Sequence, residues 1–179
     1  PPLEGALRSE GALTNALLYL GRPQEFIDSF PRRRDDAYVR FYRGFALLHL
    51  ERRAEAAAEF DGAWRWEGEH LFGRLGRVFS VLLTEGPQAA RAPLAEVEAR
   101  SSVVRDGEEL YKIGEAWALV GEKERSVAML KRSVESGFFA WPYMVRDPLL
   151  ANVRNEPALG PVLEEARIRH EAFKKRFAP

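Results

Sequence analysis

Apolar residues recur along this chain at intervals of three and four positions, the spacing that places them on one face of an α-helix. Ala, Leu, Glu and Arg are abundant and favour helix, and runs of alternating β-branched residues are absent. Glycines and prolines interrupt the pattern at short intervals. We therefore predict an all-α chain with helices at residues 3–20, 23–31, 36–50, 52–66, 69–84, 87–99, 106–120, 123–136 and 157–177.

Several of the predicted helices are joined by very short turns. Turns this short force consecutive helices to lie antiparallel, which gives a row of helix hairpins. The turns are Gly21-Arg22, Glu51-Arg52, Glu85-Gly86 and Gly121-Glu122.

One pattern of small and large residues occurs twice in the chain. From a glycine, a large residue follows at offset 3, a small one at 12, a large one at 16 and a small one at 19. Small residues on both helices of a hairpin let the backbones approach, so we expect Ala56 to face Gly44. The two sets are Gly44, Leu47, Ala56, Phe60 and Ala63, and Gly114, Trp117, Ser126, Leu130 and Ser133.

This pattern resembles the tetratricopeptide repeat (TPR), in which small, large and aromatic residues stand at these spacings. Residues 37–68 and 107–138 match best, and two degenerate units extend the resemblance over residues 7–138. It implies an α-solenoid of about four antiparallel hairpins. We expect residues 1–138 to form this TPR-like array and residues 139–179 to form a capping segment and helix of the same domain. A generic helix bundle is the alternative.

The segment after the last repeat is rich in aromatic residues and proline, which excludes a long regular helix. We predict a short helical turn over Pro148 to Val153, then the final helix. This tail can cover the open face of the last hairpin. The covering residues would be Phe138, Phe139, Trp141, Tyr143, Leu149, Leu150, Leu159, Leu163, Ala166, Ile168 and Phe173.

The tail also resembles the end of repeat arrays in bacterial multidomain proteins, some of which carry a kinase or transcription-regulator module upstream. The matching residues are Asp147, Pro148, Leu149, Arg154, Pro157, His170, Glu171 and Phe173. The resemblance implies a piece of a larger signalling or regulatory protein. Because the sequence starts at Pro1, we expect a trimmed or processed chain, cytoplasmic, or periplasmic if a signal peptide was removed.

Composition narrows the possible chemistry of the chain. Its 179 residues carry 27 basic and 27 acidic side chains, and this balance counts against a nucleic-acid binder that works by bulk charge. The longest apolar runs are too short for a membrane span. Without cysteine, and with His49, His70 and His170 on separate predicted helices, we expect no metal site and no cofactor. Nucleophile and phosphate-loop motifs are absent, so we expect a non-catalytic chain.

The TPR resemblance implies a concave groove that binds a protein or peptide segment. Phe41 and Phe45 occupy positions at which some family members clamp a carboxylate, so an apolar segment suits this groove better. Alternatively, neighbouring hairpins cover these aromatics. Other possible functions are a structural or self-assembly role, as a homo-oligomer or by intramolecular docking, and a small helical enzyme, which would bring buried ionisable residues together. The groove residues would be Asn15, Tyr19, Tyr38, Phe41, Phe45, His49, Arg77, Tyr111 and Glu115.

Overall fold

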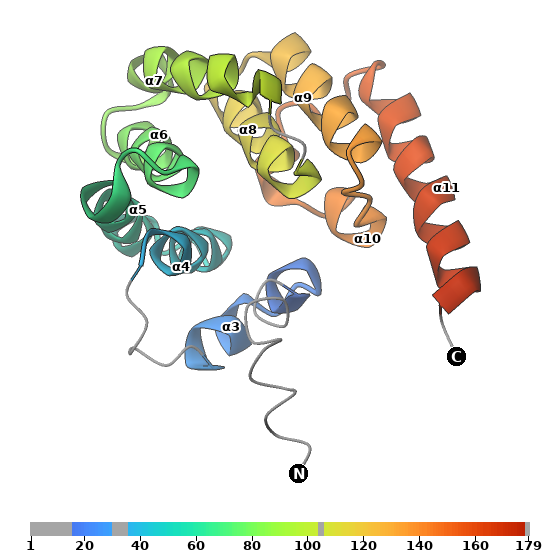
Figure 1. The fold of residues 1–179 in the computed structure, drawn as a ribbon, viewed down its shortest axis with the longest axis horizontal. Coiled ribbons are helices and arrows are strands. Elements are labelled where there is room, and N and C mark those ends of the chain that lie inside the picture. The colour runs from blue at the N-terminus through green and yellow to red at the C-terminus, as the bar shows by residue number, and fades with distance from the viewer. Residues whose placement is uncertain (1–15, 30–35, 104–105, 178–179) are drawn as a thin grey trace. The chain divides into compact units, whose positions relative to one another are not determined.

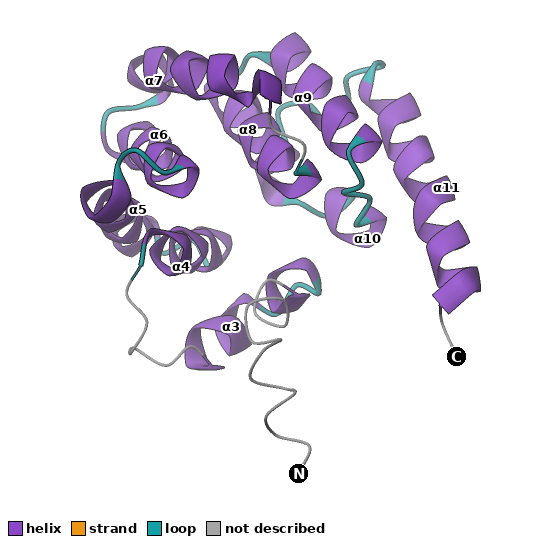
Figure 2. Ribbon diagram, in the orientation of Figure 1, coloured by secondary structure: helices purple, strands orange, loops and turns teal. Residues whose placement is uncertain are grey.

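A computed structural model of the chain describes residues 16–29, 36–103 and 106–177, and these are helical or lie in turns and loops, without a strand (Figures 1 and 2). The all-α prediction is confirmed for this part of the chain. The chain divides into two compact units, Pro1–Ser80 and Val81–Pro179, and the division falls within helix α6. The boundary predicted after residue 138 lies inside the second unit and stays a prediction.

The first unit follows the predicted helices closely. After a helical turn at residues 16–19 come α3 (Pro23–Ser29), α4 (Ala37–His49), α5 (Arg53–Glu67) and the start of α6 (Leu71–Thr84). The side chain of Asp36 accepts a hydrogen bond of 2.8 Å from the backbone N–H of Val39, which caps α4 at its N-terminus. Helices α4 and α5 pack along each other as the predicted hairpin.

The core of the first unit is built from aromatic rings. The ring centroids of Phe60 and Phe79 are 5.1 Å apart, and those of Phe45 and Phe79 are 4.9 Å apart. Phe41 lies 5.6 Å from Phe60, and all four side chains are buried. These tilted and offset ring contacts make α4, α5 and α6 one packed layer of side chains.

The second unit contains the end of α6 and the remaining helices. A short 3₁₀ turn, η1 (Ser101–Val103), follows α7 (Pro87–Arg100), and α8 (Gly107–Val120) pairs with α9 (Lys123–Glu135). Gly121 has a φ of 89°, a left-handed conformation that ends α8 and permits the short turn. The tail contains α10 (Trp141–Met144), the predicted helical turn η2 (Pro148–Leu150) and α11 (Leu159–Phe177).

The two pattern-matched hairpins share the same close contact. A Cβ atom placed on Gly44 would lie 2.7 Å from the ring of Phe60, and one placed on Gly114 would lie 2.9 Å from the Leu130 side chain. The glycine at offset 0 therefore faces the large residue at offset 16 in both hairpins. Phe60 is the nearest neighbour of Gly44, and the expectation that Ala56 faces Gly44 stays a prediction. In the second hairpin, the Ser126 hydroxyl, at the same offset as Ala56, donates to the Gly114 carbonyl over 2.8 Å.

The tail covers the second unit only in part. Tyr143, Leu149 and Leu150 are buried as predicted, and so are Leu159 and Ala166. Ile168 and Phe173 are half exposed, which corrects their place in the predicted cap. The reason is that the buried stripe of α11 is formed by Leu159, Val162 and Ala166, and no comparable stripe of buried residues continues along the second half of the helix.

Candidate functional site

Four of the predicted groove residues are fully buried. Phe41 and Phe45 belong to the aromatic core of the first unit, and Tyr111 and Glu115 lie inside the second unit. These four side chains are therefore covered by other residues of their own unit and are not exposed in a groove. For the other five, Tyr19, Tyr38 and His49 are half-buried, Arg77 is exposed, and Asn15 lies outside the described residues. Binding of a partner at these positions stays a prediction.

Tyr111 and Glu115 lead to a buried cluster of polar groups in the second unit. The Lys112 ammonium lies 3.1 Å from Glu115 Oε2, and both side chains are at most 1% exposed. The Tyr143 hydroxyl donates to Glu115 Oε1 over 3.0 Å, and the Tyr111 hydroxyl donates to Asp147 Oδ2 over 2.9 Å. Helix α8 supplies three members of the cluster, and the segment after α9 supplies Tyr143 and Asp147.

Burial dominates the electrostatics of this cluster. It raises the pKa of the Glu115 carboxyl well above its usual value, since the loss of solvent outweighs the attraction of Lys112. The nearby Asp147 raises the pKa of Glu115 further. Burial and the same Asp147 also raise the pKa of the Tyr111 phenol. A proton is therefore held more tightly at both positions than in water.

The cluster joins the tail of the chain to α8. Asp147 also accepts a hydrogen bond of 2.9 Å from the Leu149 backbone N–H, which caps η2. Asn152 donates to the carbonyl of Ala118 over 3.0 Å, and Arg154 donates to the carbonyls of Val145 and Asp147. Lys112, Glu115 and Asp147 are all buried away from solvent. The geometry serves to hold the tail in place.

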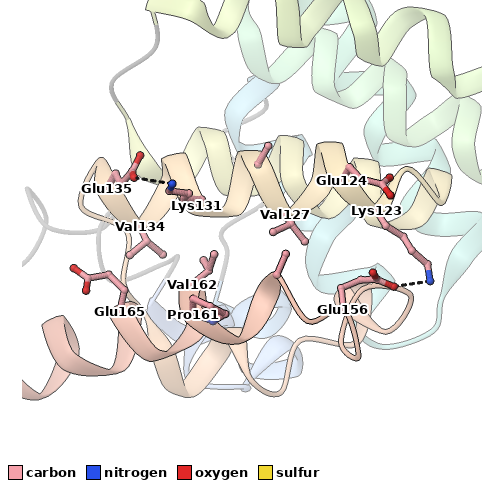
Figure 3. A pocket seen from close by; sticks show the side chains of 12 residues that line it. Lys123, Glu124, Val127, Lys131, Val134, Glu135, Glu156, Pro161, Val162 and Glu165 are labelled. Carbon is pink, nitrogen blue, oxygen red and sulfur yellow. Dashed lines mark hydrogen bonds and ion pairs between the residues drawn. The ribbon is translucent and has the colours of Figure 1, made fainter.

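A cleft of about 580 Å³ opens between α9 and α11, and we name it the α9–α11 cleft (Figure 3). Its floor is aliphatic, and Figure 3 shows Val127, Val134, Pro161 and Val162 directed into the space between the two helices. The rest of the lining includes two small residues, Ala128 and Ala158, and a charged rim. The rim consists of Lys123, Glu124, Lys131, Glu135, Glu156 and Glu165.

The rim of the cleft is acidic, and its members interact with neighbours. Two lysines and four glutamates give a net charge of −2. The Lys123 ammonium lies 2.7 Å from Glu156 Oε1, and Glu165 accepts from Arg169 over 2.6 Å. Lys131 is 3.9 Å from Glu135. These side chains edge the aliphatic floor without converging on one point inside it, so the cleft offers apolar area more than polar recognition.

Two features of the sequence position the walls of this cleft. On α11, Leu159, Val162 and Ala166 recur at intervals of three and four residues and form a buried stripe that faces α9. The Arg169 guanidinium donates to the carbonyl of Val134 over 3.0 Å and fixes the two helices to each other near the end of α9. Figure 1 shows α9 and α11 side by side.

Sequence reasoning missed both the cleft and the buried cluster. It placed the final helix as a closing cap, whereas a cleft remains beside α9 and α11, although Val127, Val134 and Val162 at its floor are themselves buried. The signal that could have pointed to the cleft is the row of small or aliphatic residues on the outer faces of both helices, Ala128 on α9 and Pro161 on α11. No local signal marks the cluster, because its two halves are separated by about thirty residues.

No family model, curated protein or solved structure matches the chain. Within residues 16–29, 36–103 and 106–177, no group of acidic and histidine side chains is arranged to hold a metal ion. The helices in these ranges also lack the length and apolarity needed to cross a bilayer.

Proposed function

We propose that this chain is a non-catalytic protein-interaction module whose α9–α11 cleft binds an amphipathic helical segment of a protein partner. The observation that carries the proposal is the open aliphatic floor between two helices, edged by charged side chains of net charge −2. An apolar helix face fits such a groove, and basic residues beside that face would complement the acidic rim.

The chemistry of the lining favours a protein segment over a small molecule. Small-molecule sites combine apolar walls with a few polar groups that converge on the ligand. In the α9–α11 cleft, the polar groups are at the rim, where Lys123 and Glu165 already interact with other side chains. The floor is aliphatic and extends along α9 from Val127 to Val134, about two helical turns, which suits side chains spaced along a helix.

We also propose that the matched hairpins are TPR-like repeats and that the chain belongs to a larger bacterial signalling or regulatory protein in the cytoplasm. Support for the repeat comes from the shared contact of Gly44 with Phe60 and of Gly114 with Leu130. Support for a non-catalytic role comes from the closure of the Lys112, Glu115 and Asp147 cluster, because ionisable groups must be accessible to act on a substrate.

The proposed function can be tested with a displayed library of short random peptides selected on the full chain. We expect enriched peptides to carry apolar residues at intervals of three and four, with basic residues beside them. Ala128→Trp fills the cleft from an exposed position and should abolish their binding. Ala92→Trp changes an exposed alanine on α7 and is the matched control. Peptides that bind the Ala128→Trp variant as well as the wild-type chain would refute the proposed site.

A further inference from the structure

Exposed apolar side chains are concentrated on α11. Six large apolar residues are exposed among the described residues, and three of them, Ile168, Phe173 and Phe177, belong to this helix. Each of the three is at least half exposed, with Ile168 at 50%. The Phe173 ring lies 6.1 Å from that of Phe139 and 4.7 Å from that of Phe177, so these rings are partly covered within one copy. A surface helix normally turns such residues toward the core, so the apolar area that stays exposed is surface on which a partner can pack.

One stripe of α11 runs from the cleft to this uncovered end. Pro161, Glu165, Ile168, Ala172 and Lys175 follow one another at intervals of four and three residues, which places them on one face of the helix. All five are exposed, and the first two line the α9–α11 cleft. This spacing is the one by which two helices pack along each other.

The α9–α11 cleft and the last turn of α11 carry opposite charge. The rim of the cleft, most of which lies on α9, has a net charge of −2, whereas the last turn of α11 contains Lys174, Lys175 and Arg176. Glu171 lies 3.7 Å from Lys174 and offsets one of these three cations. Attraction between opposite charges therefore favours an antiparallel arrangement in which the basic end of one α11 lies along the acidic cleft of another.

We propose that the α9–α11 cleft binds α11 of a second copy of this chain, antiparallel to the α11 that lines it, so that two copies form a symmetric dimer. This inference rests on the proposed function of the cleft and names its partner. A two-fold axis beside Ile168 places residue 175 of each copy next to residue 161 of the other, since both lie seven positions from the axis. Each copy supplies one cleft and one occupant, so the contact closes on two copies.

In this arrangement, Ile168 and Lys175 of the stripe both contact residues of the second copy. Ile168 packs against its own counterpart at the axis, where its exposed apolar surface becomes covered. Lys175 reaches the end of the cleft formed by Pro161 and the acidic rim. Because the stripe combines one large apolar residue with two charged ones, Glu165 and Lys175, the dimer depends on charge and weakens as salt is added.

Sedimentation of the full chain over about a hundredfold range of protein concentration tests the inference. We expect a monomer–dimer equilibrium. Ile168→Glu brings two carboxylates together at the axis and should leave only monomer. Trp66→Glu replaces a similarly exposed apolar residue in the first unit, 58% against 50% for Ile168, and is the matched control, which should dimerise as the wild type does. Circular dichroism of each variant checks that these surface substitutions leave the helices intact.

A charge-reversal pair tests the register of the two helices. Lys175→Glu should raise the dimer dissociation constant about tenfold, because the altered contact occurs twice in a symmetric dimer. Adding Pro161→Lys to this variant puts a cation opposite each new carboxylate and should restore dimerisation. A chain that stays monomeric, or a Trp66→Glu variant that dissociates as Ile168→Glu does, would overturn the inference. If the chain is monomeric but displayed peptides still require the open cleft, the proposed function stands and only the second copy is excluded as partner.

Discussion

The contact between Gly44 and Phe60 gives a sharp test of the repeated packing. Gly44→Ala adds one methyl group at a point 2.7 to 2.9 Å from three atoms of the Phe60 ring. That ring is fully buried and lies 5.6 Å from Phe41 and 5.1 Å from Phe79, so it has no free space to move into. The added methyl group must therefore displace side chains in the core of the first unit.

Two opposing terms set the size of the effect. Alanine favours a helix interior over glycine by about 1 kcal/mol. Overpacking a tight core costs about 1–3 kcal/mol, and a ring held among other rings is at the upper end of that range. We expect Gly44→Ala to lower the free energy of unfolding by about 1–2 kcal/mol. Gly160→Ala is the matched control, since a Cβ there meets no atom within 4 Å.

Hydrogen exchange of the amides in α4 and α5 measures this loss within the first unit, and urea denaturation measures it for the whole chain. The combination of Gly44→Ala with Phe60→Leu reproduces the smaller partner found at Leu130 in the other hairpin. We expect the two substitutions to compensate each other by about 1 kcal/mol in a double-mutant cycle. A Gly44→Ala chain as stable as Gly160→Ala, or a cycle without coupling, would refute the proposed contact.

Three further predictions concern ionisable groups of the second unit. Burial has the largest effect on the pKa of Glu109, and together with the charges of Asp106 and Glu108 it raises this pKa to about 6. The stability that the raised pKa contributes is fully present below the unfolded pKa of 4.5 and is lost as the pH rises through 6. Glu109→Gln should therefore stabilise the chain at pH 7 by about 0.5–1 kcal/mol, after allowance for solvent screening, and have no effect near pH 4 in urea titrations. Glu115→Ala removes the buried partner of Lys112 and the acceptor of the Tyr143 hydroxyl and should cost about 3–5 kcal/mol, whereas replacing both Lys112 and Glu115 with Met and Leu should cost less than the single change in the same titrations. Tyr111→Phe removes the donor to Asp147 Oδ2 and should cost about 1–3 kcal/mol, with faster exchange of the amides in η2 as the local readout.

The helices and turns could be predicted because their signals are local. Gly121 marks the end of α8, and Asp36 and Asp106 cap the helices that follow them. The repeated pattern also located the glycines that pack closely, and their nearest neighbours are Phe60 and Leu130 at offset 16. In each case, residues within about sixteen positions of one another carry the information.

The candidate site could not be predicted in the same way. Glu115 was assigned to an exposed groove because its position in the repeat matches Phe45, and nothing nearby shows that Tyr143 folds back to it. The α9–α11 cleft depends on where the last helix lies against α9, and this is set by the contact of Arg169 with the Val134 carbonyl and by the tail before it. Such placement is a property of the tertiary packing and leaves little trace in a local pattern.

The polar cluster also has a consequence for an exchange of the two pattern-matched hairpins. In the matched frame, Tyr111, Lys112 and Glu115 correspond to Phe41, Tyr42 and Phe45, and all six side chains are buried. One hairpin thus buries aromatic rings at these positions, while the other buries polar groups that need a matching set of hydrogen-bond donors and acceptors. If the two hairpins were exchanged, Lys112 and Glu115 would lie in the aromatic core of the first unit. The rings of Phe41 and Phe45 would then lie against Asp147 in the second unit. Each hairpin therefore depends on the residues that pack on it, which include Phe79 for Phe45, and Tyr143 and Asp147 for Glu115 and Tyr111.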